Sequence, residues 1–126
     1  LFGSKKDEIS IIDDQIGCPT YAQDIAISIV DIVSQLESNQ SSGIYHFCGK
    51  DPCSWYGFAN EIFKQAKLQN IRTPIKVNPI KTSDFPTAAR RPAFSVMDCS
   101  KIEKDFGIQP SNWQDGIRKT IKKINQ

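Results

Sequence analysis

The chain has 126 residues, which is the size of one small domain and too short for two ordinary ones. Its 39% apolar and 24% charged content is near the globular average and gives no sign of disorder. With 16 basic and 14 acidic residues the formal charge is +2, which is too balanced to favour sequence-independent binding to nucleic acid.

Targeting and membrane signals are not recognisable in the sequence. No apolar run approaches the roughly 20 residues of a membrane-spanning helix, and we expect no signal peptide and a cytoplasmic location. The sequence begins LFGSKK without a Met, as expected for a piece of a longer protein. We expect residues 1–126 to form a single domain.

The first part of the chain predicts strand, helix, loop and strand. Residues 9–13 (ISIID) are β-branched and apolar and predict a buried strand. Apolar side chains then recur at helical spacing over residues 22–36. Thr20, followed three residues later by Gln23, predicts a capping box for this helix. Residues 44–49 (IYHFCG) predict a second strand, and this order of elements indicates an α/β fold.

The middle of the chain predicts a helix, an edge strand and a long loop. Ser54 is expected to cap a helix with one apolar face over residues 55–66. Residues 75–80 (IKVNPI) alternate like a half-exposed strand, which Pro79 restricts to an edge or an end. Residues 81–92 predict no regular element, and a loop of that length in a small domain is often functional.

The last part of the chain predicts one more strand and two helices. Residues 94–98 (FSVMD) predict the strand. Ser100 with Glu103 predicts a second capping box, and Gly107 should end that helix. Ser111 is a candidate cap for a final helix. The apolar face of that helix comprises Trp113, Ile117, Ile121 and Ile124.

The residue patterns of several enzyme classes are missing. The sequence has no GxGxxG or Walker pattern to cradle a phosphate. A Tyr with a Lys four residues later, the pair that donates a proton in carbonyl reduction, does not occur at any of the three tyrosines. The single histidine, His46, lies in a predicted strand, where we expect a structural role. We therefore predict no catalytic residue in this chain.

The cysteines are expected to be reduced and mostly buried thiols. The four residues, Cys18, Cys48, Cys53 and Cys99, contain no CxxC pair. A zinc site that combines His46, Cys48 and Cys53 with a distant cysteine is the alternative, but its ligands lack the usual paired spacing.

The remaining candidate residues are ones that could bind a ligand. Arg90 and Arg91 precede Pro92 in an irregular loop, and their guanidinium groups could hold a diphosphate or form surface ion pairs. The helix start at Thr20 also offers backbone amides that suit an anion.

Several runs of residues together resemble one family. They are DQxGxPT at 14–20, GIYHFCG at 43–49, SWYxFA at 54–59 and DFPTxAxRPxxSVxD at 84–98, followed by a tryptophan and a basic helix. In this order they resemble the C-terminal part of the dTDP-4-dehydrorhamnose reductases, which are extended short-chain dehydrogenases acting on nucleotide sugars. The resemblance covers essentially the whole chain.

The resemblance implies a function for the full-length protein. It would reduce dTDP-4-dehydro-L-rhamnose to dTDP-L-rhamnose, a precursor of cell-surface polysaccharide, with NADPH or NADH. The cofactor loop and the Tyr/Lys pair of the family would lie upstream, so this fragment alone would bind no cofactor and would be inactive. The fold implied is the substrate-binding part, α/β, with few short strands and about four helices.

The resemblance also implies a set of site residues and two strand pairings. Gln15, Gly17, Pro19 and Thr20 would line the sugar side of the cleft, with Arg90 or Arg91 near the diphosphate. Residues 9–13 would pair with residues 94–98, and residues 44–48 would be the last strand of a parallel dinucleotide-binding sheet.

One departure concerns metal binding. Some relatives carry an acid at the position of Gln23, where it helps to bind a metal between subunits. A neutral amide is a poor ligand for a hard cation, so we predict no metal site.

Two other functions remain open at this stage. The chain could be a non-catalytic relative of the same fold, as in the regulatory subunit of methionine adenosyltransferase, or a small nucleic-acid-binding module that uses its basic last helix. In the isolated fragment the strand at residues 44–48, without neighbours, would expose an unpaired edge. We therefore expect the fragment to self-associate, or this segment to be rearranged and partly disordered.

Overall fold

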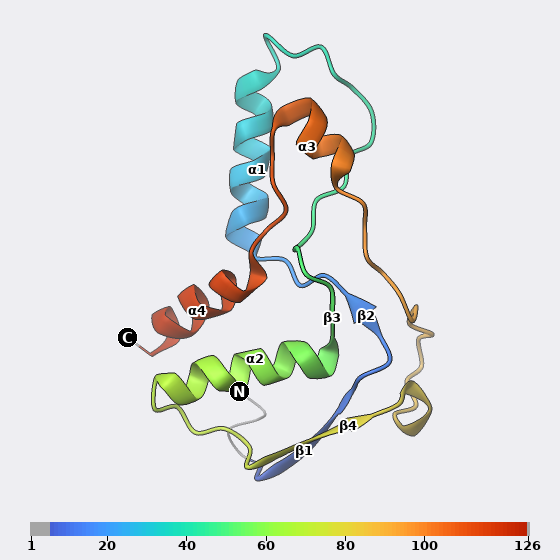
Figure 1. Cartoon of the computed structure of the whole chain (residues 1–126), viewed down its shortest axis with the longest axis vertical. Coiled ribbons are helices and arrows are strands. Elements are labelled where there is room, and N and C mark those ends of the chain that lie inside the picture. Colours follow the sequence, from blue (N-terminus) through green and yellow to red (C-terminus); the bar gives the residue numbers. More distant parts are fainter. Residues whose placement is uncertain (1–5, 126) are drawn as a thin grey trace.

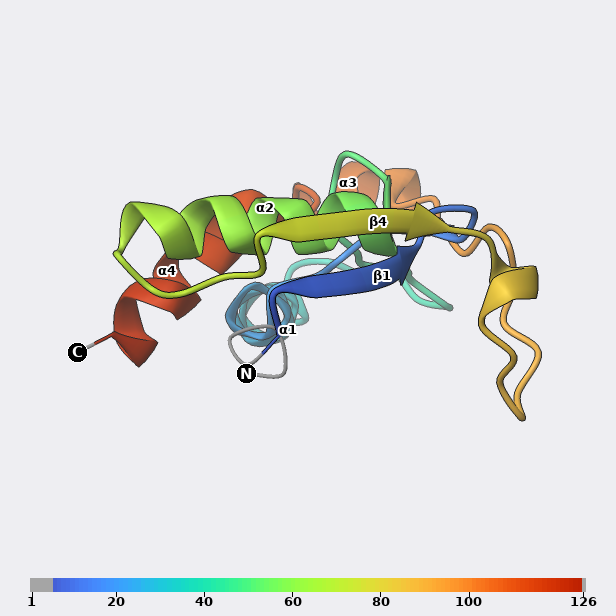
Figure 2. The same ribbon diagram turned by 90° about the horizontal axis from the view of Figure 1, so that it is seen from below.

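The predicted first strand is present, but its partner differs from the expected one. In the computed structural model, which describes residues 6–125, β1 (Glu8–Ile12) pairs in parallel with β4 (Lys76–Ile80) along its whole length (Figures 1 and 2). The expected pairing of β1 with residues 94–98 is therefore wrong. Both strands are edges of this two-stranded sheet, which is why Pro79 is tolerated inside β4.

A second, smaller sheet organises the middle of the molecule. β2 (Ile16–Gly17) pairs antiparallel with β3 (Cys53–Ser54). Residues 94–98 do not form the predicted strand. Only Phe94 takes part in a β-bridge, to Ile16, so this segment lies against β2 (Figure 1).

The strand predicted at residues 44–49 is also missing. Only Gly49 forms an isolated bridge, with Ser111, and no strand is assigned to the residues before it. A strand needs a neighbour for its backbone groups, and none of the described segments pairs with residues 44–48. His46 in this segment is exposed, so its predicted role as a structural strand residue is wrong as well.

Four α-helices occur in residues 6–125, as the sequence predicts. They are α1 (Ala22–Gln35), α2 (Trp55–Leu68), α3 (Ser100–Phe106) and α4 (Trp113–Ile124), with a single 3₁₀ turn, η2 (Thr82–Asp84), in the loop after β4. α2 packs across the sheet of β1 and β4 and against α4, whereas α1 packs beside α3 (Figures 1 and 2). None of these helices is long and apolar enough to cross a membrane.

Two of the predicted helix boundaries are confirmed. The Ser54 side chain accepts a hydrogen bond from the Gly57 amide at 3.0 Å and so caps α2. Gly107 ends α3 in the left-handed conformation, with φ of 69°, where a residue without Cβ is favoured. The cap at Ser54 and the stop at Gly107 each depend on residues within one helical turn, so both can be predicted from the sequence.

Three other predicted caps are wrong. α1 begins after Tyr21 without a side-chain cap, and the Thr20 hydroxyl bonds elsewhere. α3 begins after Cys99, and the amide of its first residue bonds to the side chain of Asp98. α4 is capped by Asn112, whose side chain accepts from the Asp115 amide at 3.2 Å.

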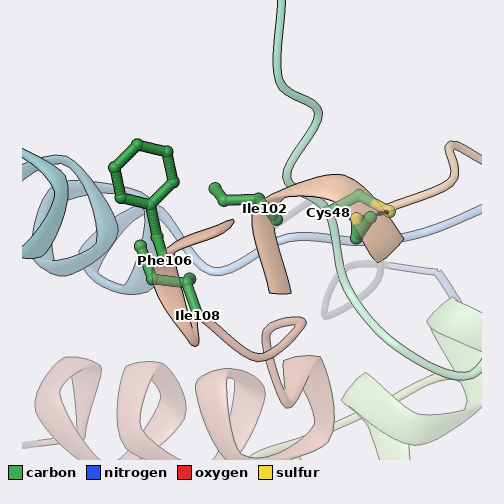
Figure 3. Close-up of a cluster of buried hydrophobic side chains, with 5 residues drawn as sticks. Cys48, Ile102, Phe106 and Ile108 are labelled. Carbon is green, nitrogen blue, oxygen red and sulfur yellow. Dashed lines mark hydrogen bonds between the residues drawn. The ribbon is translucent and has the colours of Figure 1, made fainter. Parts of the chain in front are cut away.

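The buried side chains form two clusters. One cluster lies along α3 and comprises Cys48, Cys99, Ile102, Phe106 and Ile108 (Figure 3). The other lies between α2 and α4 and comprises Ala66, Trp113, Ile117 and Ile121. Ile124, predicted on the apolar face of α4, is instead 61% exposed.

Gly49 sits where these clusters meet, and it gives a test of the packing. A Cβ at this residue would lie 1.9 Å from the Pro19 carbonyl oxygen, so Gly49→Ala forces the backbone apart. We expect a loss of about 3 kcal/mol in unfolding free energy, measured by urea denaturation. Gly57→Ala is the control, because its Cβ would meet Cys53 at an ordinary 3.5 Å, and it should gain up to about 1 kcal/mol. Equal stability of the two variants would contradict this packing.

Candidate functional site

A hollow of about 530 Å³ lies between the small sheet, the start of α2 and the loop after β4. Its walls comprise Gln15 to Thr20, Cys53 to Trp55 with Phe58, and Arg91, Pro92 and Ser95. All of the site residues predicted from the sequence line it except Arg90. Segments far apart in the chain are thus brought to one place by the pairing of β2 with β3 and by the bridge between Ile16 and Phe94.

Gln15 is an anchor of this site. It is only 7% exposed, and its side-chain amide donates a hydrogen bond to the Thr82 hydroxyl at 3.1 Å. The Thr82 hydroxyl in turn donates to Asp14 at 2.6 Å, and the Thr82 amide donates to the same carboxylate at 2.9 Å. These bonds hold the pKa of Asp14 below its ordinary value, chiefly through the Thr82 side chain. The network fastens the site loop to the turn after β4.

The Thr20 side chain is likewise used to build the site. Its hydroxyl donates to the Cys18 carbonyl at 3.0 Å and accepts from the Gly49 amide at 3.1 Å. It thereby ties residues 18–20 to the segment that ends at residue 49. At this helix start the Tyr21 amide donates to the Ser111 hydroxyl at 3.4 Å. The expectation that other amides of this start suit an anion stays a prediction.

Gly17 is needed for a close approach. A Cβ at this position would lie 2.9 Å from the Ser95 hydroxyl oxygen, which also lines the hollow. Ser95 is held there because its amide donates to the Ile16 carbonyl at 2.9 Å. The missing side chain lets the segment carrying Arg91 and Pro92 lie directly against β2.

Trp55 is a site residue that the sequence reasoning missed. Helical periodicity placed it on the packed face of α2, yet it is 58% exposed at the rim of the hollow. The Asp13 side chain accepts a hydrogen bond from Ser54, which fixes the first turn of α2 and hence the position of Trp55. Phe58 packs edge-on against the indole, with ring centroids 6.5 Å apart. The available signal was the SWYxFA run, which contains both aromatic rings.

The two adjacent arginines differ in their position relative to the hollow. Arg91 lines the hollow, whereas Arg90 does not. Both residues are exposed, and within residues 6–125 neither forms an ion pair. The guanidinium group of Arg91 is therefore available to an anion in the hollow. The surface-ion-pair alternative finds no support in the described part of the chain.

The residues that line the site include groups suited to recognition. An exposed indole offers a planar apolar surface, and a guanidinium group offers paired donors for phosphate oxygens. Among residues 6–125 no group of three His, Cys, Asp or Glu side chains is arranged to hold a metal ion, so the alternative zinc site does not form. The four cysteines are free thiols, two buried and two half-buried, as predicted. The arrangement is suited to binding a nucleoside diphosphate.

Comparison with known proteins gives a consistent result. The family model described as the RmlD substrate binding domain matches residues 2–126. A dTDP-4-dehydrorhamnose reductase from Aggregatibacter actinomycetemcomitans is 43% identical over 116 residues, which cover 90% of this chain and 40% of that protein. The chain thus spans about 40% of the length of this relative.

Solved structures confirm the predicted fold. A dTDP-4-dehydrorhamnose reductase from Clostridium acetobutylicum superposes with a TM-score of 0.85 at 30% identity, covering 99% of this chain and 41% of that one. The corresponding enzyme from Bacillus anthracis, solved in complex with NADP, gives a TM-score of 0.79 at 30% identity, covering 97% of this chain and 40% of that one. The architecture is therefore that of the C-terminal part of an extended short-chain dehydrogenase.

Proposed function

Because this chain belongs to the RmlD substrate-binding domain family, we propose that it forms the substrate-binding part of a dTDP-4-dehydrorhamnose reductase. The whole enzyme would reduce dTDP-4-dehydro-L-rhamnose to dTDP-L-rhamnose with NADPH or NADH. The relative solved with NADP supports the first of these cofactors. A cytoplasmic location is part of the proposal, and four free thiols fit a reducing compartment.

The observation that carries this proposal is the meeting of Trp55 and Arg91 at one hollow. The indole is placed to pack against the flat thymine base, and the guanidinium group to hold diphosphate oxygens. Gly17 and Pro19 line the same hollow, and we assign the sugar to this part of its wall. Gln15 and Thr20 act by positioning this wall, because their polar groups are bonded within the protein.

The chemical step belongs to another part of the enzyme. Hydride transfer needs a bound nicotinamide, and this sequence has no glycine-rich dinucleotide loop and no Tyr/Lys pair to donate the proton. The relatives carry about 60% of their length outside the matched region, as the 40% coverage implies. We assign cofactor binding and proton donation to that region.

A surface for that second part is present on this chain. α1 exposes six large apolar side chains: Ile25, Ile27, Ile29, Val30, Val33 and Leu36. Residues 44–48 form no strand pairing with any described segment, and Ile44 is 80% exposed. A helix with an uncovered apolar face next to an unpaired extended segment is half of an α/β layer. We assign this surface to packing against the dinucleotide-binding domain.

Binding of dTDP tests the assignment of the site residues. Arg91→Ala should weaken dTDP binding about tenfold or more, because a charge-assisted hydrogen bond to the diphosphate is lost. Arg90→Ala is the matched control and should leave the affinity unchanged, since Arg90 does not line the hollow. Isothermal titration calorimetry measures both. Equal effects of the two substitutions would remove the specific role of Arg91.

Activity is tested by restoring the missing part. Placing this chain in the position of the matched C-terminal region of the Aggregatibacter actinomycetemcomitans relative should give an enzyme that oxidises NADPH only when dTDP-4-dehydro-L-rhamnose is present. The isolated chain should show no such activity, because it holds neither the cofactor site nor the proton donor. A folded chimera that binds NADPH but fails to reduce this sugar nucleotide would argue against the proposed substrate.

The exposed face of α1 predicts self-association of the isolated chain. Val30 and Val33 lie three residues apart on one helix face and are 65% and 60% exposed. Val30→Glu and Val33→Glu should therefore reduce dimer formation in sedimentation velocity experiments. Leu68→Glu on α2 is the control, because Leu68 is 68% exposed but lies outside this face. A chain that stays monomeric at high concentration would contradict the prediction.

A further inference from the structure

Three of the four thiols gather at the N-terminal end of α3. The Sγ atoms of Cys48 and Cys99 lie 3.6 Å apart, and these residues are only 3% and 7% exposed. Both thiols face the carbonyl oxygen of Met97, at 3.6 and 4.0 Å. Figure 3 shows Cys48 at the end of the buried cluster, beyond Ile102. Two cysteines 51 positions apart in sequence are thus in sulfur-to-sulfur contact.

A separate hollow lies beside these residues. It has a volume of about 310 Å³, and Cys18, Cys48 and Cys99 all contribute to its walls. The hollow is distinct from the candidate site, although Cys18 lines both. Cys53 lines only the candidate site. Cys48 and Cys99 thus line one hollow, through which a small, uncharged reagent such as hydrogen peroxide would approach them.

We propose that Cys48 and Cys99 form an oxidisable pair that closes into a disulfide when the protein meets a peroxide. The peroxide oxidises one thiol to a sulfenic acid and leaves as water, with its O–O bond broken. The second sulfur then attacks the sulfenic sulfur and displaces a second water. Two thiols and one hydrogen peroxide thus give one disulfide and two water molecules. The sulfur atoms must approach from 3.6 Å to a bonded distance of about 2.05 Å.

Burial governs the speed of this reaction. The apolar surroundings raise the pKa of Cys48 and of Cys99, so the reactive thiolate is scarcer at neutral pH than for an exposed cysteine. Disulfide formation should therefore speed up by about tenfold per pH unit until the thiol pKa is reached.

The disulfide would join the two segments that support the candidate site. Cys48 precedes Gly49, whose amide bonds to Thr20 in the site loop. Cys99 ends the segment that begins at Phe94, which bridges to Ile16. A bond between them would close a covalent loop around both supports and restrict their separation. This modification is independent of which ligand the candidate site binds.

The test is peptide mapping of the oxidised protein. After treatment with hydrogen peroxide the chain should lose about 2 Da, two alkylatable thiols should disappear, and a proteolytic fragment should link Cys48 to Cys99. The unfolding midpoint should rise by roughly 5 °C or more, because the unfolded chain is constrained. The dithiol form and the original midpoint should return with a reducing agent.

Variants make the result specific. Cys53→Ala should leave the link and the rise in midpoint unchanged, whereas Cys99→Ala should abolish both. The mapping of the unsubstituted chain stands even where a cysteine variant fails to fold. Three results would each overturn the proposal. They are a link between Cys18 and Cys48, a link between two molecules, and thiols of Cys48 and Cys99 that are still open to alkylation after Cys53 has been oxidised.

Discussion

The structure depends on a junction at Ser111, where the start of α1, the end of the segment at residues 44–49 and the start of α4 meet. The backbone of Ser111 donates to the Cys48 carbonyl at 3.0 Å and accepts from the Lys50 amide at 2.9 Å. Its hydroxyl accepts from the Tyr21 amide and donates to Asp24. Ser111 is only 3% exposed, so each of these bonds satisfies a polar group that would otherwise be costly to bury. Without these hydrogen bonds the segments that carry the two buried clusters would not be held together at this point.

Signals confined to one segment could be predicted from the sequence. The positions of α1 and α2, the cap at Ser54 and the stop at Gly107 depend on neighbouring residues, and all of them are confirmed. The packed faces that the periodicity predicts are confirmed only in part, because Val33 and Trp55 are exposed. Pairings across the chain could not be predicted. The Thr20 hydroxyl fits a helix cap on local grounds, but the structure gives it a partner 29 residues away, at Gly49. Such choices are decided by tertiary contacts, which override local preference.

The candidate site shows the same division. Resemblance to a family gave the segments that line the hollow, and only Arg90 falls outside it. The roles of individual side chains could be assigned only from the structure. The side-chain amide of Gln15 donates a hydrogen bond to Thr82, whereas Trp55 is exposed. A helical pattern counts Trp55 as buried, since periodicity reports the face of a helix and carries no information on where the neighbouring elements end.

The segment at residues 44–49 connects the proposed domain interface to the site. Its first residues form no strand pairing with a described segment, which suits strand addition to a neighbouring sheet. Its last residue, Gly49, is fixed against Pro19 and Thr20 in the wall of the hollow. In the proposed enzyme, packing of the dinucleotide-binding domain on residues 44–48 would therefore set the position of this wall. In the proposed enzyme the interface and the site would share one short piece of chain, so forming the interface would also place the substrate relative to the cofactor.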